Sequence, residues 1–328
     1  MGSFDLDVVD RWSDEERALP IAEEDACRVE IDGVVVVDGF VDRRTVAVSP
    51  DSRTLSYSGR DKAAVLVDCS ANLDQWMFRN VDTLAVAKRL AQPFGIEVSL
   101  QPGLRLPAPP KKFVVSPGET AFAAIQRAAQ IAGVLVVSDG HGGLTLTRAG
   151  AARAAPLVLG ENLLTAAAEF DATDRFSRYV VVTQVGGTDE AYGPVTAPRA
   201  FATDAGVRRA NRVRIIRPDQ GVTVESARRR ADWDARVSAA RAETMTCMVL
   251  GWKQPSGALW PVNARVPVRA TAVGIEGDML ISSVEHLVND TGEVTQLRLV
   301  RPDAFTPEPK AVVAAASGVW KELAGGAR

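Results

Sequence analysis

The sequence predicts a mainly β protein of the α+β class, with two β-barrel-like regions, an inserted α/β domain and a bridging helix. Three observations lead to this prediction. Short alternating runs bounded by turn residues fill residues 4–70, about 163–217 and 245–300. Helical periodicity with capping residues appears between residues 80 and 133 and again from 223 to 244. A chain of 328 residues also exceeds one ordinary domain, so several compact units are expected.

The composition is typical of a soluble globular protein. Hydrophobic residues make up 46% and charged residues 24% of the chain, and the formal net charge is -3. This balance argues against a protein whose main task is to grip nucleic acid, which needs a basic excess. Cys27, Cys69 and Cys247 lie far apart, which favours reduced thiols. No signal peptide and no apolar run of roughly 18 residues is present, so we expect no export signal and no membrane insertion.

Residues 1–72 are predicted to form the first part of the first barrel. Phe4–Val8 alternates, and Asp32-Gly33 is a turn pair suited to the positive φ of a tight hairpin. A second turn is expected at Asp38-Gly39 and a third around Gly59. The apolar run Ala63–Val67 then predicts a wall of the barrel.

Residues 73–160 are predicted to be an inserted α/β domain. Asn80 is the expected N-cap of a first helix, which must stop before Pro93. Ser116-Pro117-Gly118-Glu119 has the pattern of a capping box for a second helix that ends at Gly133. The glycine-rich stretch Asp139–Gly143 is expected at the tip of a hairpin.

Strand character returns after the insertion. Residues 161–217 are predicted to complete the first barrel, and residues 218–244 to form the bridging helix. Residues 245–305 are predicted to form the second barrel. The tail, residues 306–328, is rich in proline and small residues and is expected to be loosely held.

The residues that usually carry chemistry do not converge in this sequence. His141 lies in a glycine loop and His286 in a strand, and no cysteine pair has metal-ligand spacing. A serine or cysteine nucleophile needs a histidine partner, and the sequence contains only these two histidines. Glu161, Glu169 and Asp171 stand in no motif. We therefore predict neither an enzyme nor a cofactor or metal site.

An arginine-rich span runs from residue 208 to residue 230. Aromatic residues are missing between its arginines, and acidic residues interleave in the helical part. This pattern favours a solvent-facing or subunit-facing surface over a nucleic-acid groove. The candidate interface residues are Arg208, Arg209, Arg212, Arg228, Arg229 and Arg230.

One short segment suggests an alternative function. Residues 113–133, with Phe113-Val114-Val115 and Pro117-Gly118-Glu119-Thr120, resemble the opening of a LysM module, a small peptidoglycan-binding unit. An apolar strand and a hairpin follow Gly133 in place of the second helix of such a module. The resemblance of this segment makes peptidoglycan binding or peptidoglycan processing the alternative function.

Several motifs in order along the chain resemble the baseplate hub proteins of contractile-tailed bacteriophages, the Mu-like tail protein P family. They are Ser58-Gly59-Arg60-Asp61, Val67-Asp68-Cys69-Ser70, the strand from Phe176, Arg230–Trp233, and the G-x-L-W-x-x-N pattern from Gly257 to Asn263. The signature positions are Ser58, Gly59, Arg60, Asp61, Asp68, Cys69, Gly257, Trp260 and Asn263. Family members usually begin with a further hairpin before the strand that matches Phe4–Val8. Its absence before Phe4 is consistent with a trimmed first barrel, with an edge supplied by a partner, or with a true start that lies upstream.

The resemblance implies a structural protein that forms a homotrimer. Each subunit would contribute two related β-barrel domains to a pseudo-sixfold ring, which adapts a sixfold tail tube to a threefold central spike. The implied partners are the trimeric tail spike, the tail tube protein and the baseplate wedge proteins, while DNA only passes through the channel. The implied location is the tail baseplate of the virion, after assembly in the host cytoplasm.

Overall fold

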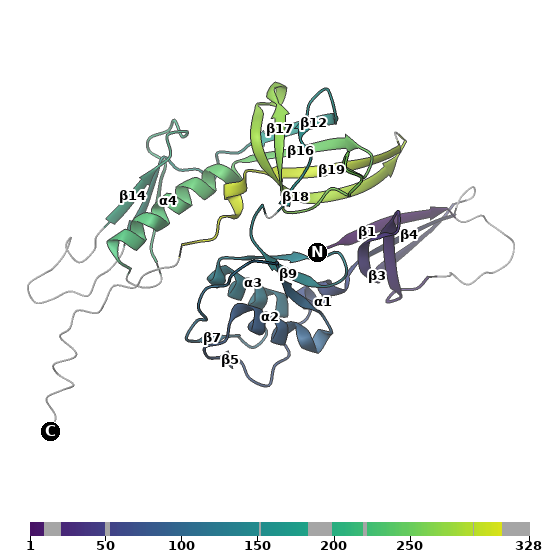
Figure 1. Ribbon diagram of the computed structural model, residues 1–328, viewed down its shortest axis with the longest axis horizontal. Coiled ribbons are helices and arrows are strands. Elements are labelled where there is room, and N and C mark those ends of the chain that lie inside the picture. Colours follow the sequence, from purple (N-terminus) through teal and green to yellow (C-terminus); the bar gives the residue numbers. More distant parts are fainter. Residues whose placement is uncertain are drawn as a thin grey trace, which may run out of the picture. The chain divides into compact units, whose positions relative to one another are not determined.

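The computed structural model describes residues 1–9, 21–49, 53–150, 152–182, 199–218, 222–290 and 292–309. The chain divides into two compact units, residues 1–148 and residues 149–328, and each is treated separately. The molecule is mainly β with few helices, as the sequence predicts (Figure 1). None of the helices in these ranges is long and apolar enough to cross a membrane.

The first unit begins with a four-stranded antiparallel sheet. It contains β1 (Ser3–Val9), β2 (Ala26–Ile31), β3 (Val34–Val48) and β4 (Arg53–Asp61), in the order β1-β4-β3-β2. Asp32 and Gly33 have φ values of 49° and 79°, so the predicted tight hairpin is confirmed. Val41, Leu55 and Tyr57 are buried on one face, whereas the other carries mostly polar side chains. This alternation is why the strands were recognisable in the sequence.

Two glycines that were predicted to form turns lie inside strands instead. A Cβ at Gly39 in β3 would lie 1.8 Å from the carbonyl oxygen of Arg60, and one at Gly59 in β4 would lie 2.1 Å from that of Phe40. The Phe4 ring also lies over Gly59, with ring carbons 2.7 Å from the same hypothetical Cβ. The predictions of turns were wrong, because these glycines allow the backbones of β3 and β4 to approach each other closely within the sheet.

The segment after β4 is helical rather than extended. Lys62–Ala64 form a 3-10 turn, and Val65–Asp68 form α1. Ala63 and Leu66, three residues apart, are fully buried in the core that follows. The prediction of a barrel wall at Ala63–Val67 was wrong, because a short apolar run does not distinguish a strand from a buried helical turn.

The α/β part of the first unit contains two helices and short strands. β5 (Met77–Phe78) pairs with β7 (Phe113–Val114), and β6 (Val98–Leu100), β9 (Leu144–Thr147) and β8 (Leu135–Ser138) form a three-stranded sheet. The helices are α2 (Thr83–Ala91) and α3 (Ala121–Ala132), which pack together. Their alanine-rich faces bury Leu90 and Ile125 in one apolar core. The predicted hairpin of β8 and β9 is confirmed.

The helix caps differ from those predicted. Asp82, not Asn80, caps α2, and its carboxylate accepts a hydrogen bond of 2.8 Å from the backbone N–H of Ala85. Thr120, not Ser116, caps α3. The Glu119 carboxylate accepts a hydrogen bond of 3.0 Å from the Ser116 N–H, which is one half of a capping box. The Glu119 N–H, however, donates to the backbone carbonyl oxygen of Ser116, so the two residues close a turn just upstream of the helix. Gly133 ends α3 with φ 68°, as predicted.

The second unit is built around a curved sheet of seven strands. These are β10 (Ala152–Arg153), β11 (Leu157–Val158), β12 (Leu163–Phe170), β16 (Glu243–Leu250), β17 (Ala264–Ala270), β18 (Ile275–Asn289) and β19 (Gly292–Val300). Their order is β10-β17-β18-β19-β16-β12, with β11 beside β17. A bridge between Leu159 and Leu163 links the two ends of the sheet around one apolar core.

The partner of β12 differs from the predicted chain path. β12 pairs with β16 from Leu163 to Phe170, and β10 and β11 pair with β17. Residues 152–170 therefore belong to the curved sheet of the second unit, and they do not complete a barrel with residues 1–72. Alternation along β12 indicates a strand with one buried face, but it carries no information about which strand lies beside it.

A second sheet of this unit packs against the long helix. β13 (Arg178–Val182) lies between β14 (Arg199–Thr203) and β15 (Val213–Ile216), antiparallel to the first and parallel to the second. The predicted helix is confirmed as α4 (Val224–Arg241), capped by Thr223. Its small buried residues pack on Tyr179 and Val181 of the sheet.

Thr306 and Glu308 also contact α4. The indole N–H of Trp233 donates to the carbonyl oxygen of Thr306 at 2.8 Å, and Arg230 pairs with Glu308. Residues 306–309 are thus held, contrary to the expectation of a loose tail. Residues 310–328 of that predicted tail lie outside the described residues.

Candidate assembly surfaces

Arg60 of the first signature joins two elements of the first unit. Its guanidinium contacts the carboxylate of Asp42 in β3 at 2.6 Å and that of Asp68 in α1 at 2.8 Å. Asp42 is the extra residue of a bulge between Val41 and Arg43, which directs its carboxylate toward Arg60. The hydrogen bond from Arg60 holds the pKa of Asp68 below its usual value. All three side chains are about half exposed, so each pair contributes only about 0–1 kcal/mol.

Asp61, the next signature residue, is buried and holds three segments together. One carboxylate oxygen accepts hydrogen bonds from the Gly2 N–H at 2.7 Å and the Ser138 hydroxyl at 2.8 Å. The Asp61 N–H donates in return to the Gly2 carbonyl at 3.0 Å. Strand β1, strand β4 and the β8 hairpin therefore meet at one side chain, which is a structural joint.

The remaining residues of the first signature also have packing roles. Cys69 ends α1, and its carbonyl oxygen accepts from the Ala121 N–H at 3.1 Å. Ser58 lies in β4 opposite Asp5 and Arg43, on the polar face of the sheet. The structure thus brings the predicted residues from Ser58 to Cys69 into one region, where they connect the sheet to the α/β part.

The second signature forms the entry to β17. Gly257 has φ 85° in a tight turn, and its N–H donates to the Gln254 carbonyl at 2.8 Å. Trp260 is buried in the core of the curved sheet. Asn263 has φ 64° and accepts a hydrogen bond of 3.0 Å from the Gly150 N–H. A left-handed backbone at this position explains the asparagine, which tolerates that conformation better than most residues.

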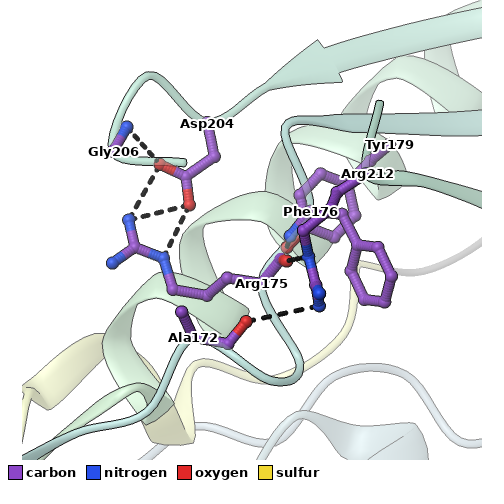
Figure 2. A network of polar contacts seen from close by, with 7 residues as sticks. All are labelled: Ala172, Arg175, Phe176, Tyr179, Asp204, Gly206 and Arg212. Carbon is purple, nitrogen blue, oxygen red and sulfur yellow. Dashed lines mark hydrogen bonds and ion pairs between the residues drawn. The ribbon is translucent and has the colours of Figure 1, made fainter. Parts of the chain in front are cut away.

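Arg212, one of the predicted interface arginines, has its side chain engaged within the chain. Figure 2 shows its guanidinium aimed at the backbone that precedes β13. It donates to the carbonyl oxygens of Arg175 at 2.9 Å, Ala172 at 3.3 Å and Thr173. It also lies 5.1 Å from the centre of the Phe176 ring. Arg212 therefore fixes this turn, and its side chain is only partly available to a partner.

Beside it, Arg175 and Asp204 form a two-pronged ion pair. The guanidinium nitrogens lie 2.9 Å from the two carboxylate oxygens, and the Gly206 N–H adds a third hydrogen bond to Asp204 (Figure 2). The Arg175 hydrogen bonds hold the pKa of Asp204 below its usual value. The pair is mostly buried and joins the start of β13 to the end of β14. The sequence analysis missed it, because the residues are far apart in the chain.

The other predicted arginines divide into exposed and paired ones. Arg208 and Arg209 are exposed between β14 and β15. On α4, Arg228 is exposed and Arg229 lies 3.8 Å from Glu225. Arg230 is engaged within the chain, at 2.6 Å from Asp234.

The sheet β13–β15 has one face that lies away from α4, and this face carries apolar residues that the sequence analysis did not single out. Phe201, Val213 and Ile215 are exposed there. The sequence did carry a signal for this surface, because both Arg199–Thr203 and Val213–Ile216 place apolar side chains on each face of a strand. An exposed apolar row of this kind marks a candidate interaction surface.

The residues considered for chemistry in the sequence each lie in a different local environment. No group of three potential metal ligands occurs among the described residues. His286 is half-buried beside the Trp252 ring, with ring centres 6.4 Å apart, and burial lowers its pKa. His141 is exposed in its loop, and Glu161 pairs with Arg269 at 2.9 Å. These residues have structural or solvent-facing positions.

Two solved structures with a similar fold are tail proteins. The 43 kDa tail protein of prophage MuSo2 from Shewanella oneidensis is 32% identical, with a TM-score of 0.81 over 94% of this chain and 91% of that one. A tail protein from Neisseria meningitidis is 26% identical, with a TM-score of 0.75 over 93% and 90% of the two chains. The fold thus places the chain in the class of tail proteins.

Sequence comparisons identify the family. The baseplate hub protein gp44 of Escherichia phage Mu is 32% identical over 285 residues, which are 84% of this chain and 75% of that protein. Residues 1–61 match the N-terminal domain model of GpP-like Mu baseplate assembly proteins, and residues 223–308 match the fourth domain of GpP. Residues 63–148 match the second domain of gp44-like baseplate hub proteins. The chain belongs to the Mu-type baseplate hub family and has a structural role in the phage baseplate.

The LysM-like segment falls inside one of these matches. Residues 113–133 lie within the second hub domain, and their strand, turn and helix pack into its core. The Arg127 guanidinium contacts Glu119 at 2.9 Å and lies 4.4 Å from the centre of the Phe113 ring. These contacts within the domain account for the residues that resemble the opening of a LysM module.

Proposed function

We propose that the chain acts as a homotrimeric hub, in which the two sheet-bearing units of each subunit alternate around a pseudo-sixfold ring. The ring matches a sixfold tail tube on one side and a threefold spike on the other. The mechanism is symmetry matching and transmission of load, without a chemical step.

The observation that carries this proposal is the N-terminal sheet. Its order leaves β1 and β2 as edge strands, and no described strand pairs with their outer edges. Long open edges invite uncontrolled pairing unless a neighbour covers them. A ring of subunits supplies such a neighbour for every copy.

The proposed partners follow from the same geometry and from the family. They are two further copies of the chain, the trimeric spike, the tail tube protein and the baseplate wedge proteins. DNA passes through the ring without binding, for which a net charge of -3 is suitable. The protein is proposed to assemble in the host cytoplasm and to reside in the tail baseplate of the virion.

Mass measurement in solution tests the proposal. The full chain is analysed by light scattering after size exclusion, alone and with the spike protein of the same particle. We expect a mass three times the chain mass of 35.0 kDa, and a threefold axis in electron micrographs of the complex. A strict monomer under both conditions would refute it.

A further inference from the structure

The outer face of the sheet β13–β15 carries a continuous apolar row. Phe201 is the register partner of Val180, and Val180 is that of Ile215, so the three side chains line up across the strands. Val213, two residues before Ile215, extends the row on the same face. The exposed fractions are 71% for Ile215, 47% for Phe201 and 45% for Val213. Because α4 occupies the opposite face, this row is not needed for the core of its own unit.

The surroundings of the row are strongly basic. The Arg178 guanidinium lies 4.5 Å from the centre of the Phe201 ring, and Arg199 shares that face by strand alternation. Residues 199–217 contain six arginines and one acidic residue, a formal charge of +5 in a chain whose net charge is -3. The chemistry calls for a partner surface with apolar side chains and an acidic rim.

This charge excludes the pairing of the face with itself. In a twofold contact, Arg178 and Arg199 of one copy would meet the same arginines of the other. Like charges brought together at an interface oppose association. If the occupant is another copy, it must therefore present a different surface, and a contact of that kind builds rings.

The chain carries such a surface at its N-terminal sheet. Residues 1–61 contain 15 acidic and 7 basic residues, a formal charge of -8. On the edge strand β1, Leu6 and Val8 are 48% and 43% exposed, and they alternate with Asp5 and Asp7. Leu6 and Val8 share the face of Tyr57 and Leu55, whereas Asp5 and Asp7 lie on the opposite, polar face, so the two kinds of side chain flank the open outer edge of β1.

We propose that the outer face of β13–β15 in one copy binds the acidic N-terminal sheet of a second copy, around β1. Ile215 and Phe201 supply the apolar contact with Leu6 and Val8, and the long side chains of Arg178 and Arg199 reach past the open edge of β1 toward Asp5 and Asp7. This inference rests on the proposed homotrimer and names the surfaces that join its subunits. Each copy uses both surfaces, so three head-to-tail contacts close the ring.

Two charge-introducing variants of the full chain test the two sides of the contact. Ile215→Asp places a carboxylate in the apolar row of the basic face, and Leu6→Lys places a cation against that row and its arginines. Each is expected to raise the concentration for half-association at least about 30-fold, the effect of losing an interface hot spot. Matched controls are Val288→Asp, at 72% exposure in β18, and Val34→Lys, at 49% exposure at the far end of the N-terminal sheet. Thermal melting checks that all four variants fold.

The decisive measurement is the mass of a mixture of the two variants. Ile215→Asp keeps the β1 side, and Leu6→Lys keeps the β13–β15 face, so the mixture can make one intact contact. We expect monomers from each variant alone, a 1:1 dimer from the mixture, and wild-type masses from the controls.

Other results would overturn the inference in distinguishable ways. Variants that keep the wild-type trimer mass would place the contact elsewhere and leave the proposed function standing. Monomeric variants whose mixture stays monomeric would mean that the basic face meets a surface other than β1. A wild-type chain that is monomeric at its highest soluble concentration would remove both this contact and self-assembly of the chain alone.

Discussion

The N-terminal sheet and the curved C-terminal sheet differ in how their edge strands are covered and in how much core they enclose. Both are antiparallel over most of their strands, but the curved sheet links its two ends through Leu159 and Leu163 and encloses one continuous core. The N-terminal sheet has two open edges and a small cluster centred on Val41, Leu55 and Tyr57. It depends on close strand contact at Gly39 and Gly59 and on the joint at Asp61. A closed sheet is stable by burial, whereas an open one needs specific contacts and a neighbour.

The largest expected difference is in cysteine reactivity. Cys247 lies in the core of the curved sheet, and burial raises its pKa to about 12. Cys27, in β2, is half-buried, and burial together with the charge of Asp38 raises its pKa. Because the thiolate is the reactive form and Cys247 requires opening of the core, we expect its alkylation to be slower by roughly a thousandfold or more. Mass spectrometry of iodoacetamide adducts over time measures this.

Denatured protein is the control for the labelling experiment, and there both thiols should react at similar rates. Equal rates in the native protein would mean that the curved sheet opens as readily as the N-terminal one.

The next largest effect is expected from a cavity in the curved sheet. Leu297 in β19 is fully buried, so Leu297→Ala should lower the free energy of unfolding by about 2–5 kcal/mol. Leu250→Ala, at an exposed position of β16, should change it by less than about 0.5 kcal/mol. Urea denaturation followed by circular dichroism compares the two. Equal losses would show that the core is not the main source of stability.

Gly59→Ala tests the close strand contact of the N-terminal sheet. The added methyl group would collide with the Phe40 carbonyl oxygen and the Phe4 ring, so we expect a loss of about 1–3 kcal/mol. Gly2→Ala is a suitable control, because its Cβ would lie no closer than 3.4 Å to any neighbour. Faster hydrogen exchange of β1 in Gly59→Ala alone would locate the damage. An unchanged β1 would contradict the proposed role of this glycine.

The smallest effect is expected at Arg60. Its ion pairs with Asp42 and Asp68 are exposed, so Arg60→Ala should cost about 0–1 kcal/mol, and less in high salt. Denaturation at two salt concentrations measures this. A loss above about 2 kcal/mol, independent of salt, would show that the signature arginine stabilises the joint by packing rather than by charge.

Local features were largely predictable from the sequence. Asp32-Gly33 and Gly133 were recognised because their backbone requirement is expressed by the residue type itself. Helix α4 was recognised from its small apolar positions, Ala227, Ala231, Ala235 and Val237. The family motifs were found in the correct order, and the structure accounts for them as joints and turns.

The candidate surfaces were predictable only in part. Arg208 and Arg228 are exposed as expected, but Arg212 is engaged with backbone carbonyls from residues 172–175. Ile215 and Phe201 escaped notice because a short run that is apolar on both faces is typical of a buried strand as much as of an exposed one.

The sequence by itself determined most of the strands, the helices α2, α3 and α4, and the family to which the chain is similar. These properties depend on neighbouring residues, through side-chain period and backbone preference. Only the tertiary structure decided that β12 pairs with β16, that Gly39 and Gly59 lie inside strands, and that Arg175 meets Asp204. Those outcomes depend on contacts between residues tens of positions apart, and such contacts arise only when the whole chain finds its packing.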